Sequence, residues 1–182
     1  MARPRNKLFF ETSLPDFLPP GKEWLRDYES NAGAKALYNS TAYYPEMEGS
    51  GSDLFKLFLP NVWRHSSRDG VQGLIHPDTV YTETNGLAMR QALYPRVRKH
   101  FHFVNECKLF DIGHTREFSI NVYGTSTADV NFESISNLYM PQTIRLCREP
   151  VSGPVQDMKD PHGKWNLAGH PDRILVIAAT AL

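Results

Sequence analysis

The densest group of positive charges in this 182-residue sequence lies between residues 90 and 100. It consists of Arg90, Arg96, Arg98, Lys99 and His100. Closely spaced guanidinium and ammonium groups are the side chains that neutralise phosphates in complexes with nucleic acids. A solvated helix face has the same composition, so two interpretations stand: a surface for DNA phosphates, or an ordinary polar surface.

A large aromatic residue, Phe110, follows an apolar segment and precedes a polar loop. Such a phenylalanine usually belongs to the core, but it can also act as a platform on which an unpaired base stacks. The residues His76-Pro77-Asp78 end another apolar segment. Open α/β sheets bind ligands at such strand ends, although a simple strand-terminating turn gives the same sequence.

The histidines do not form a metal site that the sequence supports. His100 and His102 share one face of an expected strand, and His114 follows in a loop. No carboxylate or cysteine at ligand spacing completes this set. We therefore expect no bound metal.

Composition excludes several classes of protein. Lys plus Arg and Asp plus Glu both number 20, so the net charge of zero excludes a strongly basic nucleic-acid binder. Two distant cysteines, Cys107 and Cys147, argue against a disulfide scaffold and favour a reducing compartment. No apolar run approaches the ~20 residues of a membrane span. The N-terminus lacks the apolar core of a signal peptide, so we expect a cytoplasmic protein.

Hydrophobic spacing predicts the elements that carry these residues. We expect helices over residues 22–37, 53–63 and 85–99, with a kink or restart at Pro60 in the second. We expect strands over residues 71–76, 101–107 and 118–123. The first is apolar throughout, which is typical of a strand buried on both faces. The loop between the last two is too short for a crossover helix, so they should be antiparallel.

This alternation of helices and strands predicts an α/β fold, with part of a Rossmann-like sheet that ends in an antiparallel pair. Residues 1–48 are an irregular and helical lead-in, and residues 49–124 form the sheet-containing unit. From residue 125 to 182 the pattern is irregular, with five prolines, until a last strand near Arg173.

Five segments of the sequence occur in a particular order and spacing. They are DLFKLFL at 53–59, GVQGLIHP at 70–77, a helix with Arg90 at 87–93, ECKLF at 106–110 and FSINVYG at 118–124. Together they resemble the C-terminal part of the catalytic domain of adenine-N6 DNA methyltransferases. The resemblance is closest to the large enzymes of restriction-modification and phage-defence systems.

The resemblance implies methyl transfer from S-adenosylmethionine to adenine N6 in DNA, without a metal. It places Asp53, Leu54 and Phe58 on the cofactor side and Phe110 against the flipped adenine. The basic residues 90–100 would lie near DNA phosphates. It assigns no catalytic residue within this chain.

Two motifs of that family are absent. The sequence has no F-x-G-x-G loop for S-adenosylmethionine and no Asn/Asp-Pro-Pro-aromatic loop, since its single Pro-Pro pair is Pro19-Pro20. We therefore expect a C-terminal fragment of the methyltransferase that is inactive alone, with residues 125–182 beginning a DNA-recognition or linker region. Its partners would be DNA and the missing N-terminal half in trans.

Two alternatives remain open. One is a non-catalytic binding module, or a subunit that completes a split methyltransferase or restriction enzyme. The other is a nuclease, for which Asp157, Lys159 and Asp160 are the nearest acidic and basic set. Their Pro- and Gly-rich surroundings favour solvated charge instead.

Overall fold

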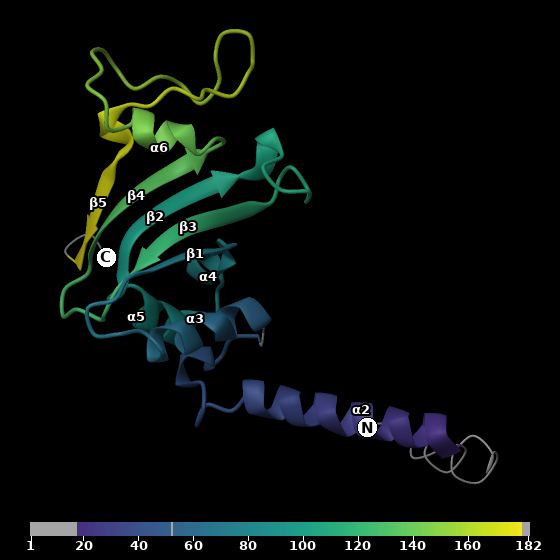
Figure 1. Cartoon of the computed structure of the whole chain (residues 1–182). Coiled ribbons are helices and arrows are strands. Elements are labelled where there is room, and N and C mark those ends of the chain that lie inside the picture. The colour runs from purple at the N-terminus through teal and green to yellow at the C-terminus, as the bar shows by residue number, and fades with distance from the viewer. Residues whose placement is uncertain (1–17, 52, 180–182) are drawn as a thin grey trace.

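A five-stranded mixed sheet forms the centre of the computed structural model, which describes residues 18–51 and 53–179 (Figure 1). Its strands are β1 (Gln72–Pro77), β2 (Val97–Val104), β3 (Glu117–Tyr123), β4 (Asn131–Leu138) and β5 (Leu175–Ala178). Their order in the sheet is β1-β3-β2-β4-β5. With the α-helices around it, this sheet confirms the α/β class expected from the sequence.

The strand directions bring several carboxyl ends to one edge of the sheet. Strand β3 is antiparallel to both β1 and β2, so β1 and β2 run parallel to each other. Strand β4 is parallel to β2, whereas β5 is antiparallel to β4. The predicted antiparallel pairing of the segments 101–107 and 118–123 is confirmed, because the loop between β2 and β3 is too short to cross the sheet.

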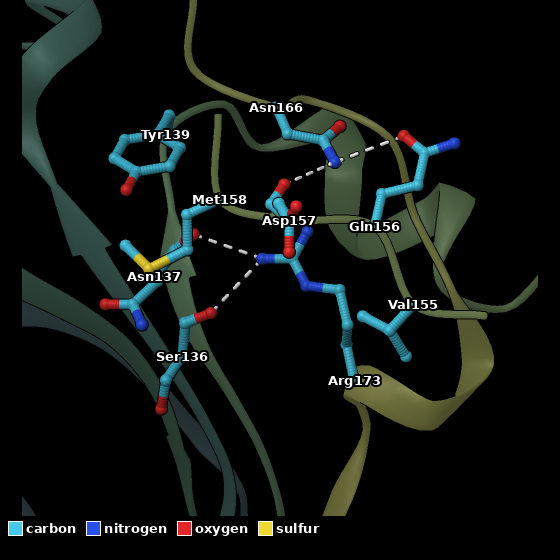
Figure 2. Close-up of a pocket in the computed structure, with 9 residues that line it drawn as sticks. All are labelled: Ser136, Asn137, Tyr139, Val155, Gln156, Asp157, Met158, Asn166 and Arg173. Atoms are coloured by element: carbon cyan, nitrogen blue, oxygen red, sulfur yellow. Dashed lines mark hydrogen bonds between the residues drawn. The ribbon is translucent and has the colours of Figure 1, made fainter. Parts of the chain in front are cut away.

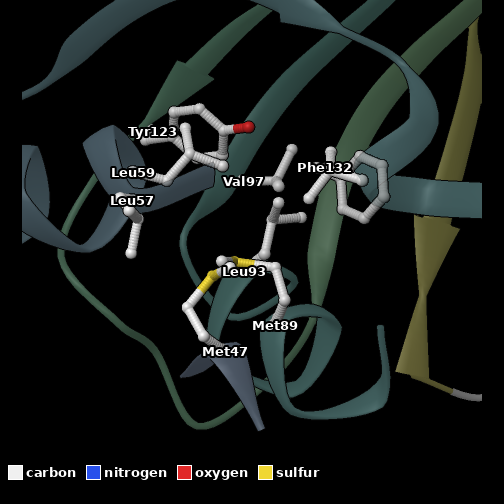
Figure 3. Close-up of a cluster of buried hydrophobic side chains, with 9 residues drawn as sticks. Met47, Leu57, Leu59, Met89, Leu93, Val97, Tyr123 and Phe132 are labelled. Atoms are coloured by element: carbon white, nitrogen blue, oxygen red, sulfur yellow. The ribbon is translucent and has the colours of Figure 1, made fainter. Parts of the chain in front are cut away.

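Three helices cover one face of the sheet. They are α3 (Leu54–Arg64), α4 (Thr79–Thr82) and α5 (Leu87–Leu93). Figure 3 shows their buried side chains meeting those of the strands. This core contains Met47, Leu57, Leu59, Val80, Met89, Leu93, Val97, Tyr123 and Phe132. Burying an aliphatic or aromatic side chain of this size contributes about 1.5–3 kcal/mol, so the cluster fixes the helices on the sheet.

The opposite face has a second core, which is displaced toward β4. It contains Phe101, Phe103, Phe118, Ile135, Leu138 and Cys147. Helix α6 (Gln142–Leu146) lies over this part of the sheet (Figure 1). The chain then continues through a long irregular segment to a 3-10 turn, Pro171–Arg173, and returns as β5.

Helix α2 (Leu18–Tyr38) includes the predicted helix 22–37 and projects away from the sheet (Figure 1). Its Trp24 and Tyr28 rings stack at 5.5 Å, and both are more than half exposed. The helix predicted over 53–63 is confirmed by α3, but it continues through the buried Pro60, so the expected restart at that residue is wrong. Residues 1–17 of the lead-in lie outside the described residues.

The predicted helix 85–99 is wrong in its second half. Helix α5 ends at Leu93, and β2 begins at Val97, four residues before the expected strand. Pro95 has no N–H to continue the helical hydrogen bonds. Val97 is fully buried between sheet and helices, so core packing favours the extended conformation here.

The prediction that 71–76 is buried on both faces is also wrong. Strand β1 lies at the end of the sheet order and pairs only with β3 among the described strands. Val71 and Ile75 are 71% and 58% exposed. Only the face with Leu74 and His76 is covered, because α3 to α5 all lie on that side.

The irregular pattern expected from residue 125 is wrong for residues 131–138, which form β4. On the helix-covered face, β4 places Phe132 and then Ser134. Ser134 can be buried there because it is hydrogen-bonded to His100. A polar residue at this buried position interrupts the alternation of apolar and polar residues by which strands are recognised in a sequence. The predicted last strand near Arg173 is confirmed by β5.

Candidate functional site

The loop between β2 and β3 holds Phe110 at the carboxyl end of β2. Its first turn, Asn105–Cys107, leads into Lys108, whose φ of 51° is left-handed. The Phe110 ring packs edge-on against Phe118, with centroids 4.9 Å apart, and remains 42% exposed. Phe110 is therefore anchored at one edge while part of its ring is open to solvent.

A buried amide braces this loop from inside. The Asn105 side chain is fully buried and donates to the carbonyls of Phe110, Ile112 and Gly113 at 3.0, 3.1 and 3.4 Å. Its Oδ1 accepts from the Phe110 N–H at 3.1 Å. These bonds replace the regular backbone pairing that the loop lacks, so one side chain sets the position of Phe110.

The predicted phosphate-binding residues lie at the other end of β2. Strand β2 has eight residues, which places its ends roughly 23 Å apart at ~3.3 Å per residue. Arg96 and Arg98 lie at its amino end, whereas Phe110 follows its carboxyl end. The structure therefore does not bring these basic residues and the aromatic platform together.

Each basic residue also has intramolecular partners. Arg90 donates to the Glu83 carbonyl, and Arg96 donates to the Ala92 carbonyl and stacks on Trp63. Arg98 donates to the carbonyls of Pro95, Val97 and Thr125. Lys99 lies on the opposite sheet face from His100, 3.4 Å from the Glu133 carboxylate. The group does not form one continuous basic face.

The residues predicted on the cofactor side lie at the start of α3. Asp53 is its N-cap residue, and its carboxylate lies 3.3 Å from the Lys56 ammonium. Leu54 and Phe58, one turn apart, are 61% and 66% exposed. The three residues share a region of α3, and the two apolar ones face outward.

A buried lysine lies beside that helix end, and sequence reasoning missed it. Lys56 is 2% exposed, and its Nζ lies 2.6 Å from Glu83 Oε2 and 3.0 Å from Ser50 Oγ. Burial tends to raise the pKa of Glu83, but the hydrogen bonds from Lys56 and Ser50 outweigh it, so that pKa is lowered. This ion pair ties α3 to the segment after α4, and Ser50, from the segment before α3, bonds to both members of the pair.

A buried polar cluster lies on the helix-covered face toward the carboxyl ends of β1 and β2. His100 Nε2 is 3.0 Å from Asp78 Oδ1, and His100 Nδ1 is 3.1 Å from Ser134 Oγ. Burial tends to raise the pKa of Asp78, but the hydrogen bonds from His100 and Ser119 keep it below its ordinary value. Asp78, which follows β1, is thus connected through His100 in β2 to Ser134 in β4.

The cluster continues through His76. Asn121 Nδ2 donates to His76 Nε2 at 2.9 Å, and the Tyr123 hydroxyl is 2.7 Å from the same nitrogen. His76 Nδ1 is 2.9 Å from the Pro77 carbonyl, which fits a neutral ring protonated at Nδ1. Burial lowers the pKa of His76. The Tyr81 hydroxyl donates to Asn121 Oδ1 at 2.6 Å.

Asp78 contacts His100, and His100 contacts Ser134. An acid, a histidine and a serine in this sequence of contacts are the arrangement that activates a nucleophilic serine. Two features argue against nucleophilic catalysis. Ser134 is only 8% exposed, and it lies in the middle of β4 rather than at a strand end. Burial also raises the pKa of Tyr81, which keeps its hydroxyl protonated as a donor. The cluster therefore connects four strands and α4 through neutral and paired groups.

No group of metal-binding side chains occurs in the part of the chain that the structure describes. His102 lies 3.7 Å from Glu117, whereas the exposed His114 lies 3.3 Å from Glu106. His100 is held by Asp78 and Ser134 instead. The three histidines therefore make separate pairs.

The acidic and basic set considered for a nuclease is also dispersed. Asp157 lines a cavity of about 130 Å³, in which Arg173 donates to the carbonyls of Ser136 and Asn137 (Figure 2). Lys159 stacks on Trp165, with 4.3 Å between Nζ and the ring centroid. Asp160 Oδ1 accepts from two backbone N–H groups of its own turn. The three charged residues therefore lie in separate local settings and do not form one acidic and basic site.

Sequence reasoning missed most of the polar cluster. Ser119, Asn121 and Tyr123 alternate with apolar residues in β3, a pattern that is typical of a strand with one side facing solvent. All three are fully buried, because α3 and α4 cover that face. A signal was present in His76-Pro77-Asp78, but its partners come from other strands.

Comparison with models of protein families finds no match, and a search of curated proteins finds no similar sequence. Among the residues that the structure describes, no helix has the length and apolar character needed to cross a bilayer.

Proposed function

We propose that this chain is a C-terminal part of the catalytic domain of an adenine-N6 DNA methyltransferase. The complete domain would transfer a methyl group from S-adenosylmethionine to adenine in DNA. The single observation that carries this proposal is the arrangement of β1, β3 and β2, with the half-open Phe110 ring at the carboxyl end of β2. The five sequence segments of the resemblance map onto α3, β1, α5, the Phe110 loop and β3 in order.

The arrangement fits part of a doubly wound sheet. Strands β1 and β2 are parallel, α5 lies between them in sequence, and β3 is inserted between them antiparallel. Asp78 and the Phe110 loop both follow the carboxyl ends of parallel strands, the edge at which open α/β sheets bind ligands. An anchored aromatic ring at that edge suits stacking on an extrahelical base.

The open side of β1 supports the proposal that the sheet continues in another segment or chain. Val71 and Ile75 are largely exposed on the face of β1 that the described helices leave uncovered. An exposed apolar edge strand is a surface on which further strands pair. The parallel strands of an α/β fold are normally covered on both faces.

The described residues do not form a complete site for S-adenosylmethionine. The Asp53 carboxylate is close to Lys56, and Leu54 and Phe58 point away from the core. The sequence also lacks the F-x-G-x-G loop. In this proposal the missing half of the domain holds the cofactor, and the three residues of α3 contribute only one wall. The purified chain alone should not bind S-adenosylmethionine.

The role of Phe110 can be tested with DNA alone. The probes are two short duplexes that differ in one base opposite an abasic site, adenine in one and thymine in the other. We expect tighter binding to the adenine duplex and loss of that preference in Phe110→Ala. Base–aromatic stacking of about 1–3 kcal/mol corresponds to a roughly 5- to 150-fold effect.

Tyr43→Ala is the matched control, because Tyr43 is an exposed aromatic residue outside the Phe110 loop. It should bind both duplexes as the wild type does. Equal binding of the two duplexes by wild type, or an unchanged preference in Phe110→Ala, would contradict the proposed adenine site.

The open edge of β1 also favours a second candidate, a subunit that completes a split enzyme. A polypeptide with the F-x-G-x-G and Asn/Asp-Pro-Pro-aromatic motifs should then restore methylation of DNA adenine when mixed with this chain. Amide exchange in β1 should slow in the mixture. Slower exchange without methylation would favour a non-catalytic binding module.

A further inference from the structure

A cavity of about 170 Å³ lies where the end of α3, the start of β1 and the segment after β3 meet. It is lined by Trp63, Gln72, Arg68, Arg96 and neighbouring hydroxyl residues. This is the end of the sheet opposite to Phe110. The cavity is therefore separate from the site proposed for the base.

Two of the residues that line this cavity, Trp63 and Gln72, each carry a buried polar atom without a hydrogen-bond partner. In the described part of the chain, the buried side-chain atoms that lack a partner are Trp63 Nε1 and Gln72 Oε1. Leaving such an atom unpaired costs about 1–3 kcal/mol. Native proteins rarely leave a buried polar atom unpaired unless a water or a ligand bonds to it. The presence of two such atoms on residues of one cavity therefore indicates that a polar ligand fills it.

The charges around the cavity favour an anion. The Arg96 guanidinium stacks on Trp63 at 5.0 Å from the ring centroid and is partly buried. Burial lowers the pKa of Arg96, whereas the nearby Glu46 carboxylate raises it and is itself paired with Arg64. In residues 18–51 and 53–179 no carboxylate lies within ion-pair distance of Arg96 or Arg68.

The carboxyl end of α3 opposes this preference. A helix carries about half a negative charge at that end, so it disfavours an anion. Two arginines supply two full positive charges, and Trp63, which also lines the cavity, has an unpaired Nε1–H. The balance is therefore positive.

The donor pattern suits a phosphate group better than a carboxylate. Arginines bind phosphate oxygens in pairs of parallel hydrogen bonds, and the indole N–H can reach a further oxygen. Gln72 can accept from a protonated phosphate oxygen, or present its N–H₂ group after an amide flip that leaves its shape unchanged. A tetrahedral ligand offers acceptors in several directions, whereas a planar carboxylate does not.

We propose that this cavity is a phosphate-binding site, held by Arg96, Arg68, Trp63 and Gln72. Its ligand is the phosphate of a small phosphomonoester or of a DNA backbone. The proposal does not depend on the methyltransferase assignment, because it concerns binding by this chain alone. Its failure would leave the tests of Phe110 unaffected.

The indole N–H of Trp63 provides a direct readout in the full-length chain. The sequence has three tryptophans, and a Trp63→Phe variant identifies the Trp63 signal in a ¹H–¹⁵N spectrum. Inorganic phosphate should shift this signal saturably, while the Trp24 and Trp165 signals stay in place. Arg96→Gln and Arg68→Gln should each weaken binding at least tenfold.

Arg68 is exposed, so Arg68→Gln keeps the test valid if Arg96→Gln unfolds the chain. Arg145→Gln is the control, because Arg145 is an exposed arginine paired with Glu149 on α6 and should bind phosphate normally. Two results would overturn the proposal: chloride at equal ionic strength produces the same shift, or Arg68→Gln binds phosphate as tightly as the wild type does. Water would then be the molecule that fills the cavity.

A second arm identifies the source of the phosphate. A 12-nucleotide DNA strand should shift the same signal and compete with inorganic phosphate if the ligand is a backbone. Saturable binding of inorganic phosphate that DNA does not displace would instead support a small phosphomonoester. Both results support the site.

Discussion

Replacement of Asn105 tests whether one buried amide sets the position of Phe110. In Asn105→Ala the carbonyls of Phe110, Ile112 and Gly113 lose their donor, and the Phe110 N–H loses its acceptor. The backbone of the loop should then become mobile while the sheet stays folded. Phe110 would lose its fixed position against Phe118.

The magnitude follows from the bond count. Asn105 Nδ2 has two protons to share among three carbonyl contacts, and Oδ1 accepts one bond. These three bonds contribute about 0.5–1.5 kcal/mol each. Water reaches part of the loop after the change, so we expect a loss of about 2–3 kcal/mol in the free energy of unfolding. The Tm should fall by roughly 4–12 °C for a chain of this size.

The assay is urea unfolding with amide exchange at Phe110. We expect the Phe110 N–H to exchange at least roughly tenfold faster in Asn105→Ala, since each ~1.4 kcal/mol is a factor of ten. Asn166→Ala is the matched control. Asn166 also braces a loop through three bonds, but they are exposed, so its loss should cost less than about 1 kcal/mol.

Asn105→Asp separates the two halves of the amide. The carboxylate keeps the acceptor for Phe110 N–H but faces three carbonyls, which a buried charge does not tolerate. At pH 8 we expect it to be at least as destabilising as Asn105→Ala, with recovery relative to wild type at pH 5, where it can protonate and donate. Equal stability losses in Asn105→Ala and Asn166→Ala, with unchanged Phe110 exchange, would refute the reasoning.

Three further changes test the core and its ionisable groups. Burial lowers the pKa of His76, so as the pH falls the unfolded chain binds a proton at this histidine before the folded chain does. The free energy of unfolding should therefore fall as the pH decreases below about 6.5. His76→Gln should flatten the decline of Tm with falling pH, and an unchanged slope would contradict this explanation. Lys56→Met should cost about 1–3 kcal/mol in urea unfolding and return the pKa of Glu83 toward its ordinary value by NMR titration; an unshifted titration would show that Lys56 does not control it. Leu93→Ala should cost about 2–5 kcal/mol, because Leu93 is fully buried in the helix–sheet core; a calorimetric loss below about 1 kcal/mol would show that this core is loosely packed.

The two proposed binding regions lie at opposite ends of the sheet. Phe110 belongs to the carboxyl end of β2, and Arg96 belongs to its amino end. The separation explains why a basic group and an aromatic platform that are close in sequence need not serve one ligand. Arg96 and Phe110 are 14 positions apart in the sequence, and the full length of β2 separates them in space.

Local sequence determined the elements with strong periodicity. The apolar residues of 53–63 repeat with the helical period, and α3 forms there as expected. Segment 118–123 alternates with period two, and β3 forms there. The short loop before it required an antiparallel pairing, because a connection of that length cannot cross a sheet.

Tertiary structure decided which faces are buried and which side chains meet. The alternation in β3 has the same pattern whether its polar face meets water or a helix, and only α3 and α4 bury Ser119 and Asn121. Ser134 reaches His100 from a strand 34 residues away, a distance at which sequence spacing carries no contact information. The edge position of β1 likewise depends on which strands join the sheet. The sequence by itself therefore determined the local elements, whereas the polar cluster and the orphaned pair at Trp63 and Gln72 exist only because the fold brings distant segments together.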